Sequence, residues 1–140
     1  MKYISAEEFL KQPKKVQEVF IDWWQPSIGD LYCIKQRINL FDDTTQQILQ
    51  TVSFNYDEAS KNLMLVFNFI APLFTEGQLR KFIEDKTNRI VELYLNVYKQ
   101  YNFMLVSRNS EEFILYESRK EDLLQAYWKV ACEIAKEELN

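Results

Sequence analysis

The chain has 140 residues, a formal net charge of −4 and 47% apolar residues, with no histidine. A chain of this length can bury a core without disulfides or metal, so we expect residues 1–140 to form a single domain. The missing histidine excludes Ser-His-Asp, Cys-His and HExxH sites within the chain. The two glycines, Gly29 and Gly77, lie too far apart for a P-loop or a GxGxxG phosphate cradle.

The N-terminal segment predicts two short helices. Residues 5–8 read Ser-Ala-Glu-Glu, a capping box that begins a helix reaching Leu10. Pro13 suits the first turn of a second helix, which Pro26 ends. Its apolar residues recur at helical spacing: Val16, Val19, Phe20 and Trp23.

The middle of the chain, residues 31–56, allows either strand or helix. Residues 31–34 are compatible with a short strand, and Asp42-Asp43 with a turn. Apolar and polar residues alternate over 47–56, which indicates a strand. A helix that begins at a capping box, Thr44-x-x-Gln47, remains the alternative.

A β-hairpin is expected around residues 57–62, whose composition is typical of a turn. The following stretch, 63–70, is almost entirely apolar. Strands of that kind are covered on both faces, so we expect it to pair with 47–56 as a central strand that Pro72 closes.

Residues 75–78 read Thr-Glu-Gly-Gln and form another capping box. An apolar face continues from there to Tyr101 at helical spacing. We therefore expect one long central helix over 76–101, or two helices with a break at Thr87-Asn88.

The C-terminal part predicts a second hairpin and a last helix. Residues 103–107 and 112–117 form the hairpin, which turns at 108–110. A Ser118-x-x-Glu121 box caps the last helix, whose buried stripe is Leu124, Tyr127, Trp128, Ala131, Ile134 and Ala135. The predicted fold is therefore α+β, an antiparallel sheet from two β-hairpins packed with about four helices. An all-α middle is the alternative.

The sequence offers little for catalysis, and we expect no catalytic, cofactor-binding or metal-binding residues. Cys33 and Cys132 fit no metal-binding spacing and are expected as reduced core thiols. Several of the acidic pairs sit in predicted turns or first helical turns, where they are expected to form turns or to complement the helix dipole. With no leader or membrane-spanning stretch visible, a cytoplasmic protein is expected.

The charge balance also bears on partners. Seventeen basic residues face 21 acidic ones, and residues 81–120, the most basic stretch, mix both signs. Nucleic-acid binding depends on phosphate neutralisation, so a nucleic-acid partner is not expected.

Aromatic residues make up 15% of the chain, which is more than one small core needs. Tryptophan and tyrosine are enriched at interface hot spots. Trp24 lies one position off the helical stripe that ends at Trp23, so one of the two is expected to face outward. Tyr3, Tyr98 and Tyr116 are further candidates for a contact with a protein partner or a second copy.

One segment supports a resemblance. Residues 70–83 contain Ile-Ala-Pro-Leu-Phe-Thr followed by Gln-Leu, residues 24–30 read Trp-Gln-Pro-Ser-Ile-Gly-Asp, and Trp128 lies in the C-terminal helix. Together they resemble small uncharacterised proteins of Gram-positive bacterial phages and prophages, although Ala71 interrupts the Ile-Pro-Leu of that group. The resemblance implies a phage or prophage setting and no mechanism.

The leading hypothesis is a small non-catalytic protein that binds another protein and forms homo-oligomers. A nucleic-acid accessory or regulatory factor is the first alternative, and it needs a local basic face. A carboxylate-dependent, Mg²⁺-assisted hydrolase is the second, and it needs acidic groups converging in one pocket.

Overall fold

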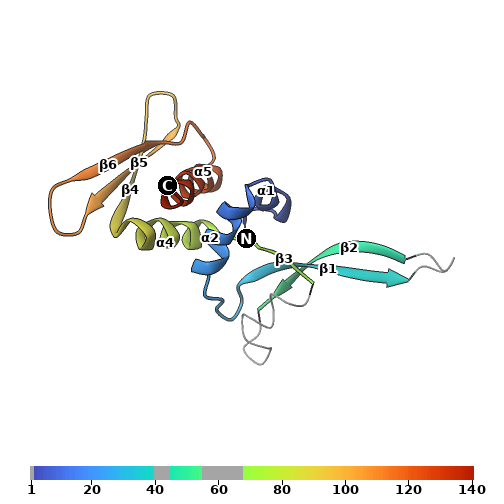
Figure 1. Ribbon diagram of the computed structural model, residues 1–140. Coiled ribbons are helices and arrows are strands. Elements are labelled where there is room, and N and C mark those ends of the chain that lie inside the picture. The colour runs from blue at the N-terminus through green and yellow to red at the C-terminus, as the bar shows by residue number, and fades with distance from the viewer. Residues whose placement is uncertain (1, 40–44, 55–67) are drawn as a thin grey trace.

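The computed structural model describes residues 2–39, 45–54 and 68–140 (Figure 1). Within these residues the protein is α+β, with four helices and two separate three-stranded antiparallel sheets. The helices are α1 (Ala6–Leu10), α2 (Lys14–Trp23), α4 (Glu76–Thr87) and α5 (Leu123–Glu138). The strands are β1 (Leu31–Asn39), β2 (Thr45–Ser53), β3 (Phe69–Pro72), β4 (Arg89–Leu95), β5 (Tyr101–Ser107) and β6 (Phe113–Glu117).

The N-terminal helices form as the sequence predicts. The hydroxyl oxygen of Ser5 accepts a hydrogen bond from the backbone N–H of Glu8 and caps α1. On α2 the predicted stripe faces inward, and Val16 and Phe20 are fully buried. Both helices thus contribute one apolar face to the core.

The first sheet has the strand order β2-β1-β3, with β1 in the centre. The predicted pairing of 47–56 with 63–70 is wrong, because β2 pairs with β1, and β3 pairs with the other edge of β1. Residues 63–67 lie outside the described residues, and so does the turn predicted at Asp42-Asp43. The strand alternative for 31–56 is confirmed over 31–39 and 45–53.

The β1–β2 ribbon extends away from the helices (Figure 1). Few of its described side chains are buried beyond Cys33, and Lys35 and Gln36 are exposed. A strand that leaves the core lacks a clear buried face, which explains why its apolar pattern was weak.

The single central helix expected over 76–101 is wrong; the alternative break at Thr87-Asn88 is confirmed, but no second helix follows it. The capping box is confirmed, since Thr75 and Gln78 bond reciprocally, but α4 ends at Thr87. Asn88 takes the left-handed conformation with φ 53° and stops the helix. Residues 89–95 then continue as a strand, whose β-branched and aromatic residues suit that conformation.

The second sheet has the order β4-β5-β6. The hairpin predicted from 103–107 and 112–117 is confirmed as β5 and β6, and β4 adds a third strand. The two hairpins therefore belong to different sheets and do not share one. Helix α5 packs on one face of this sheet, where the rings of Phe103 and Tyr127 lie 5.1 Å apart.

Helix α5 buries the predicted stripe, but a different residue caps it. The N-cap is Asp122, whose carboxylate accepts from Gln125 N–H at 2.9 Å. Ser118 is buried instead, and its hydroxyl donates to the carbonyl oxygen of Tyr101 at 2.6 Å. A buried hydroxyl needs such a partner, so Ser118 ties the end of β6 to β5.

Many of the described aromatic rings fill the core between the helices. Phe20 lies at its centre, with ring centroids 4.4 Å from Phe82 and 5.1 Å from Trp128. Phe9 and Phe74 complete the cluster. None of the described helices is long and apolar enough to cross a membrane.

Candidate protein-interaction surface

One face of the β4-β5-β6 sheet carries no described helix or strand (Figure 1). The strand register arranges this outer face in three rows. They are Ile90–Val106–Phe113, Glu92–Met104–Leu115 and Tyr94–Asn102–Glu117. Six of these nine side chains are apolar, which is unusual for a sheet face that meets solvent.

The outer face is substantially exposed. Phe113 and Leu115 are 54% and 53% exposed, and Ile90 and Tyr94 are about as open. With large side chains of about 150–250 Å² each, the exposed parts of these four residues present on the order of 300–400 Å². The largest exposed apolar patch on a monomeric protein is typically of this size and is often functional.

A polar atom in the outer face also lacks a partner. Asn102, in the central strand, is buried, and its side-chain oxygen accepts no hydrogen bond from the described residues. A buried carbonyl oxygen left unpaired is costly.

The two edges of this sheet differ. Beside β4, the guanidinium of Arg80 donates to the Val91 carbonyl at 3.1 Å, and Val91 N–H donates to the Glu84 carboxylate at 3.0 Å. Both groups come from α4 and occupy the edge of β4. Strand β6 pairs only with β5 among the described strands, so its other edge is open.

The three tyrosines that the sequence predicts as contact residues differ in exposure and in location. Tyr98 lies in the β4–β5 turn and is 73% exposed. Tyr116 lies on the opposite side of β6 from the outer face, and its hydroxyl donates to the Glu137 carboxylate at 2.8 Å. Burial and this carboxylate raise the pKa of Tyr116 above its usual value. Tyr3 is partly buried against the core.

The sequence predicts Trp24 as a candidate for contact with a partner. That prediction is wrong, because its side chain is only 1% exposed. Helix α2 ends at Trp23, and Trp24 is its extended C-cap. Helical periodicity no longer applies there, so Trp24 turns inward and stacks on Phe69 at 6.0 Å. Trp23 is the more exposed of the pair.

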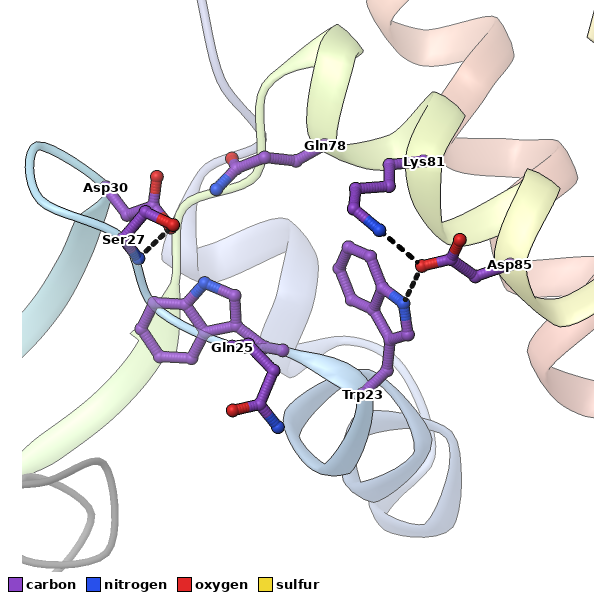
Figure 2. Close-up of a pocket in the computed structure, with 8 residues that line it drawn as sticks. Trp23, Gln25, Ser27, Asp30, Gln78, Lys81 and Asp85 are labelled. Atoms are coloured by element: carbon purple, nitrogen blue, oxygen red, sulfur yellow. Dashed lines mark hydrogen bonds and ion pairs between the residues drawn. The ribbon is translucent and has the colours of Figure 1, made fainter.

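A cleft of about 320 Å³ lies beside these tryptophans (Figure 2). Trp23 Nε1–H and Lys81 Nζ both donate to the carboxylate of Asp85, at 2.9 and 2.7 Å. The Lys81 and Trp23 hydrogen bonds lower the pKa of Asp85. The Lys81 ammonium and the Asp85 carboxylate in this cleft are therefore paired with each other.

The remaining residues around this cleft are mostly polar: Gln25, Ser27, Asp30 and Gln78. Trp24 also lines it, and its indole N–H is buried without a hydrogen-bond partner among the described residues. The backbone N–H of Ser27 donates to Asp30, and the Gln78 side chain caps α4. These contacts account for Ser27, Asp30 and Gln78 but leave the Trp24 indole N–H unpaired among the described residues.

A second hollow of about 300 Å³ lies along α5. Three lysines and one glutamate line it together with apolar and amide groups: Lys120, Lys129, Lys136, Glu133, Trp128, Cys132, Gln12 and Gln125. This is a local basic region on an acidic protein. Cys132 in its wall is a buried free thiol, as predicted, and so is Cys33.

The described residues show no group of three or more His, Cys, Asp or Glu side chains that could hold a metal ion. The hydrolase alternative needs converging acidic groups, and it gains no support from this part of the chain. Comparison with protein-family models, with curated proteins and with solved structures finds no match.

Sequence reasoning missed the outer face itself. Its β4 residues were assigned to a helix, so Ile90 and Tyr94 could not be placed beside β5. A signal was nevertheless present in β6, where Phe113, Ile114, Leu115 and Tyr116 are consecutive apolar residues. A strand with apolar side chains on both faces, and a helix on only one of them, leaves the other face uncovered.

Proposed function

We propose that this protein is a cytoplasmic protein encoded by a phage or prophage. It acts without catalysis, by binding another protein and by associating with itself. The observation that carries the proposal is the outer face, with six apolar side chains in register and no described element over them. Isolated exposed apolar residues need no explanation, but a contiguous patch is typical of a binding surface.

A charge at the centre of the outer face tests this function. Met104→Lys places an ammonium group in the middle row, whereas Ile28→Lys changes an exposed apolar residue in the α2–β1 loop. Immobilised wild-type protein and the Ile28→Lys control are expected to retain the same protein from host lysate. Met104→Lys should retain at least about tenfold less, because burying an unpaired charge is unfavourable.

Equal retention by the Met104→Lys variant would show that the outer face is not the binding surface. Retention of no protein by the wild type would overturn the function itself. Circular dichroism and urea unfolding of each variant establish that the fold is intact.

The nucleic-acid alternative has one observation in its favour, the three lysines around the hollow on α5. Phosphate contacts by lysine give affinity that falls steeply with salt. Under the proposed function, a gel-shift experiment with DNA and RNA fragments at low salt shows no complex. A complex that Lys129→Glu removes would favour the nucleic-acid role instead.

A further inference from the structure

The open edge of β6 is the least protected part of the second sheet. Natural edge strands are blunted by charges, prolines or covering elements. The edge of β4 has such protection from Arg80 and Glu84. In β6, residues Phe113, Ile114 and Leu115 are all exposed and uncharged, so this edge is suited to pair with another strand.

We propose that two copies of the chain join through β6, antiparallel across a two-fold axis, to form a continuous six-stranded sheet. The inference rests on the proposed self-association and names its surface. The register that overlaps all five residues of β6 sets Leu115 opposite its own copy and Phe113 opposite Glu117 of the second copy. An isologous contact of this kind closes at two subunits.

Charges at the two ends of β6 favour the antiparallel arrangement. Glu111 and Glu112 precede the strand, and Arg119 and Lys120 follow it. All four are exposed, and none makes an ion pair in the part of the chain that the structure describes. Antiparallel pairing brings the acidic pair of one copy to the basic pair of the other, whereas parallel pairing would set like charges together.

The backbone supports contact at these ends. Tyr101 N–H donates to the carbonyl of Lys120 at 2.9 Å, so the chain stays beside β5 beyond the end of β6. Arg119, between Ser118 and Lys120, has φ 58° and forms a bulge. A bulge ends regular pairing, which limits the paired segment to β6 itself.

The pairing would also enlarge the outer face. Paired strands lie about 4.7–4.9 Å apart, so the Leu115 side chains of the two copies would lie side by side, and Phe113 of each copy would lie beside Glu117 of the other. A stable interface buries about 800 Å² per partner. Five residues of one strand supply part of that area, and the merged outer face offers a larger surface to a further protein.

Sedimentation velocity over a concentration series tests this dimer. The wild type is expected to be a dimer at tens of micromolar. Leu115→Lys should weaken association by at least about tenfold, since two ammonium groups would face each other across the axis. Ile28→Lys, which places the same charge on an exposed apolar residue of the α2–β1 loop, should leave the dimer intact.

A charge-exchange pair provides a second, independent measurement. The double variants Glu111→Lys/Glu112→Lys and Arg119→Glu/Lys120→Glu should each be monomeric alone, because like charges then meet. Mixed in equal amounts they should form a heterodimer, which a loss of folding in either variant would not produce.

A wild type that stays monomeric, or a dimer that Leu115→Lys leaves unchanged, would overturn the β6 pairing. Binding of another protein through the outer face is judged separately by Met104→Lys, which lies away from the open edge. Failure of the dimer is thus distinguishable from failure of partner binding.

Discussion

Replacing Phe20 by alanine is expected to lower the free energy of unfolding by about 3–5 kcal/mol. The ring is fully buried and contacts four other aromatic rings, those of Phe9, Phe74, Phe82 and Trp128. These residues come from four segments, α1, the chain between β3 and α4, α4 and α5. Removing the ring leaves a cavity where they meet, and the surrounding helices cannot all collapse into it. Urea unfolding followed by circular dichroism measures the change.

The matched control is Ile28→Ala, which truncates an exposed side chain and should change stability by less than about 0.5 kcal/mol. Small proteins are stable by only about 5–15 kcal/mol, so the Phe20→Ala variant should lose a large share of the total. A loss below about 1 kcal/mol would mean that Phe20 does not lie at the centre of the core.

The thiol of Cys132 is expected to react with a disulfide reagent at pH 8 roughly a thousandfold more slowly in the folded protein than in urea. Burial raises the pKa of Cys132 to about 12, and only the thiolate attacks. Burial also raises the pKa of Cys33. The release of the chromophoric thiol from the reagent measures both rates, and prompt reaction of one thiol per folded chain would contradict the burial of these cysteines.

The raised pKa of Cys132 also makes the free energy of unfolding depend on pH in the alkaline range. The folded-state pKa of Cys132 lies above the unfolded value of about 8.5. The buried thiol therefore contributes fully to the free energy of unfolding below pH 8.5. This contribution is lost as the pH rises from there towards 12. At pH 10 the expected loss is about 2 kcal/mol relative to pH 7, and Cys132→Ala should reduce that pH dependence.

Local signals predicted where α1 and α4 begin. Ser5 and Thr75 are N-caps whose side chains bond where a capping box requires. The buried apolar stripes of α2 and α5 could be predicted from the helical spacing of their apolar residues alone. The β5–β6 hairpin was also predictable, because its strands are joined by a short polar turn.

The errors occurred where a distant contact or one backbone conformation decides the structure. The apolar residues of 89–95 fit a helix face as well as a strand, and the left-handed Asn88 decides between them. The pairing of β1 with β3 joins segments more than thirty residues apart, which no local pattern encodes. Trp24 was misplaced because the helix ends one residue before it.

The candidate surface could not be predicted from the sequence because of those same errors. The expectation of a surface patch came from the aromatic count, but most of the described rings are buried or pack against the core. Only two of the six apolar side chains of the outer face are aromatic, Tyr94 and Phe113, and the other four are aliphatic. Aliphatic side chains on a strand are the usual sign of a buried face, so their exposure became visible only in the assembled sheet.

The most direct test of the central claim is a methyl NMR titration of the wild-type protein over a range of its own concentrations and with the captured partner. The methyl signals of Ile90, Met104 and Leu115 should shift or broaden, while those of Ile28 and the core residue Ile83 stay unchanged. Unchanged signals from the outer face, with shifts confined to residues elsewhere such as Ile48 on β2, would contradict the account.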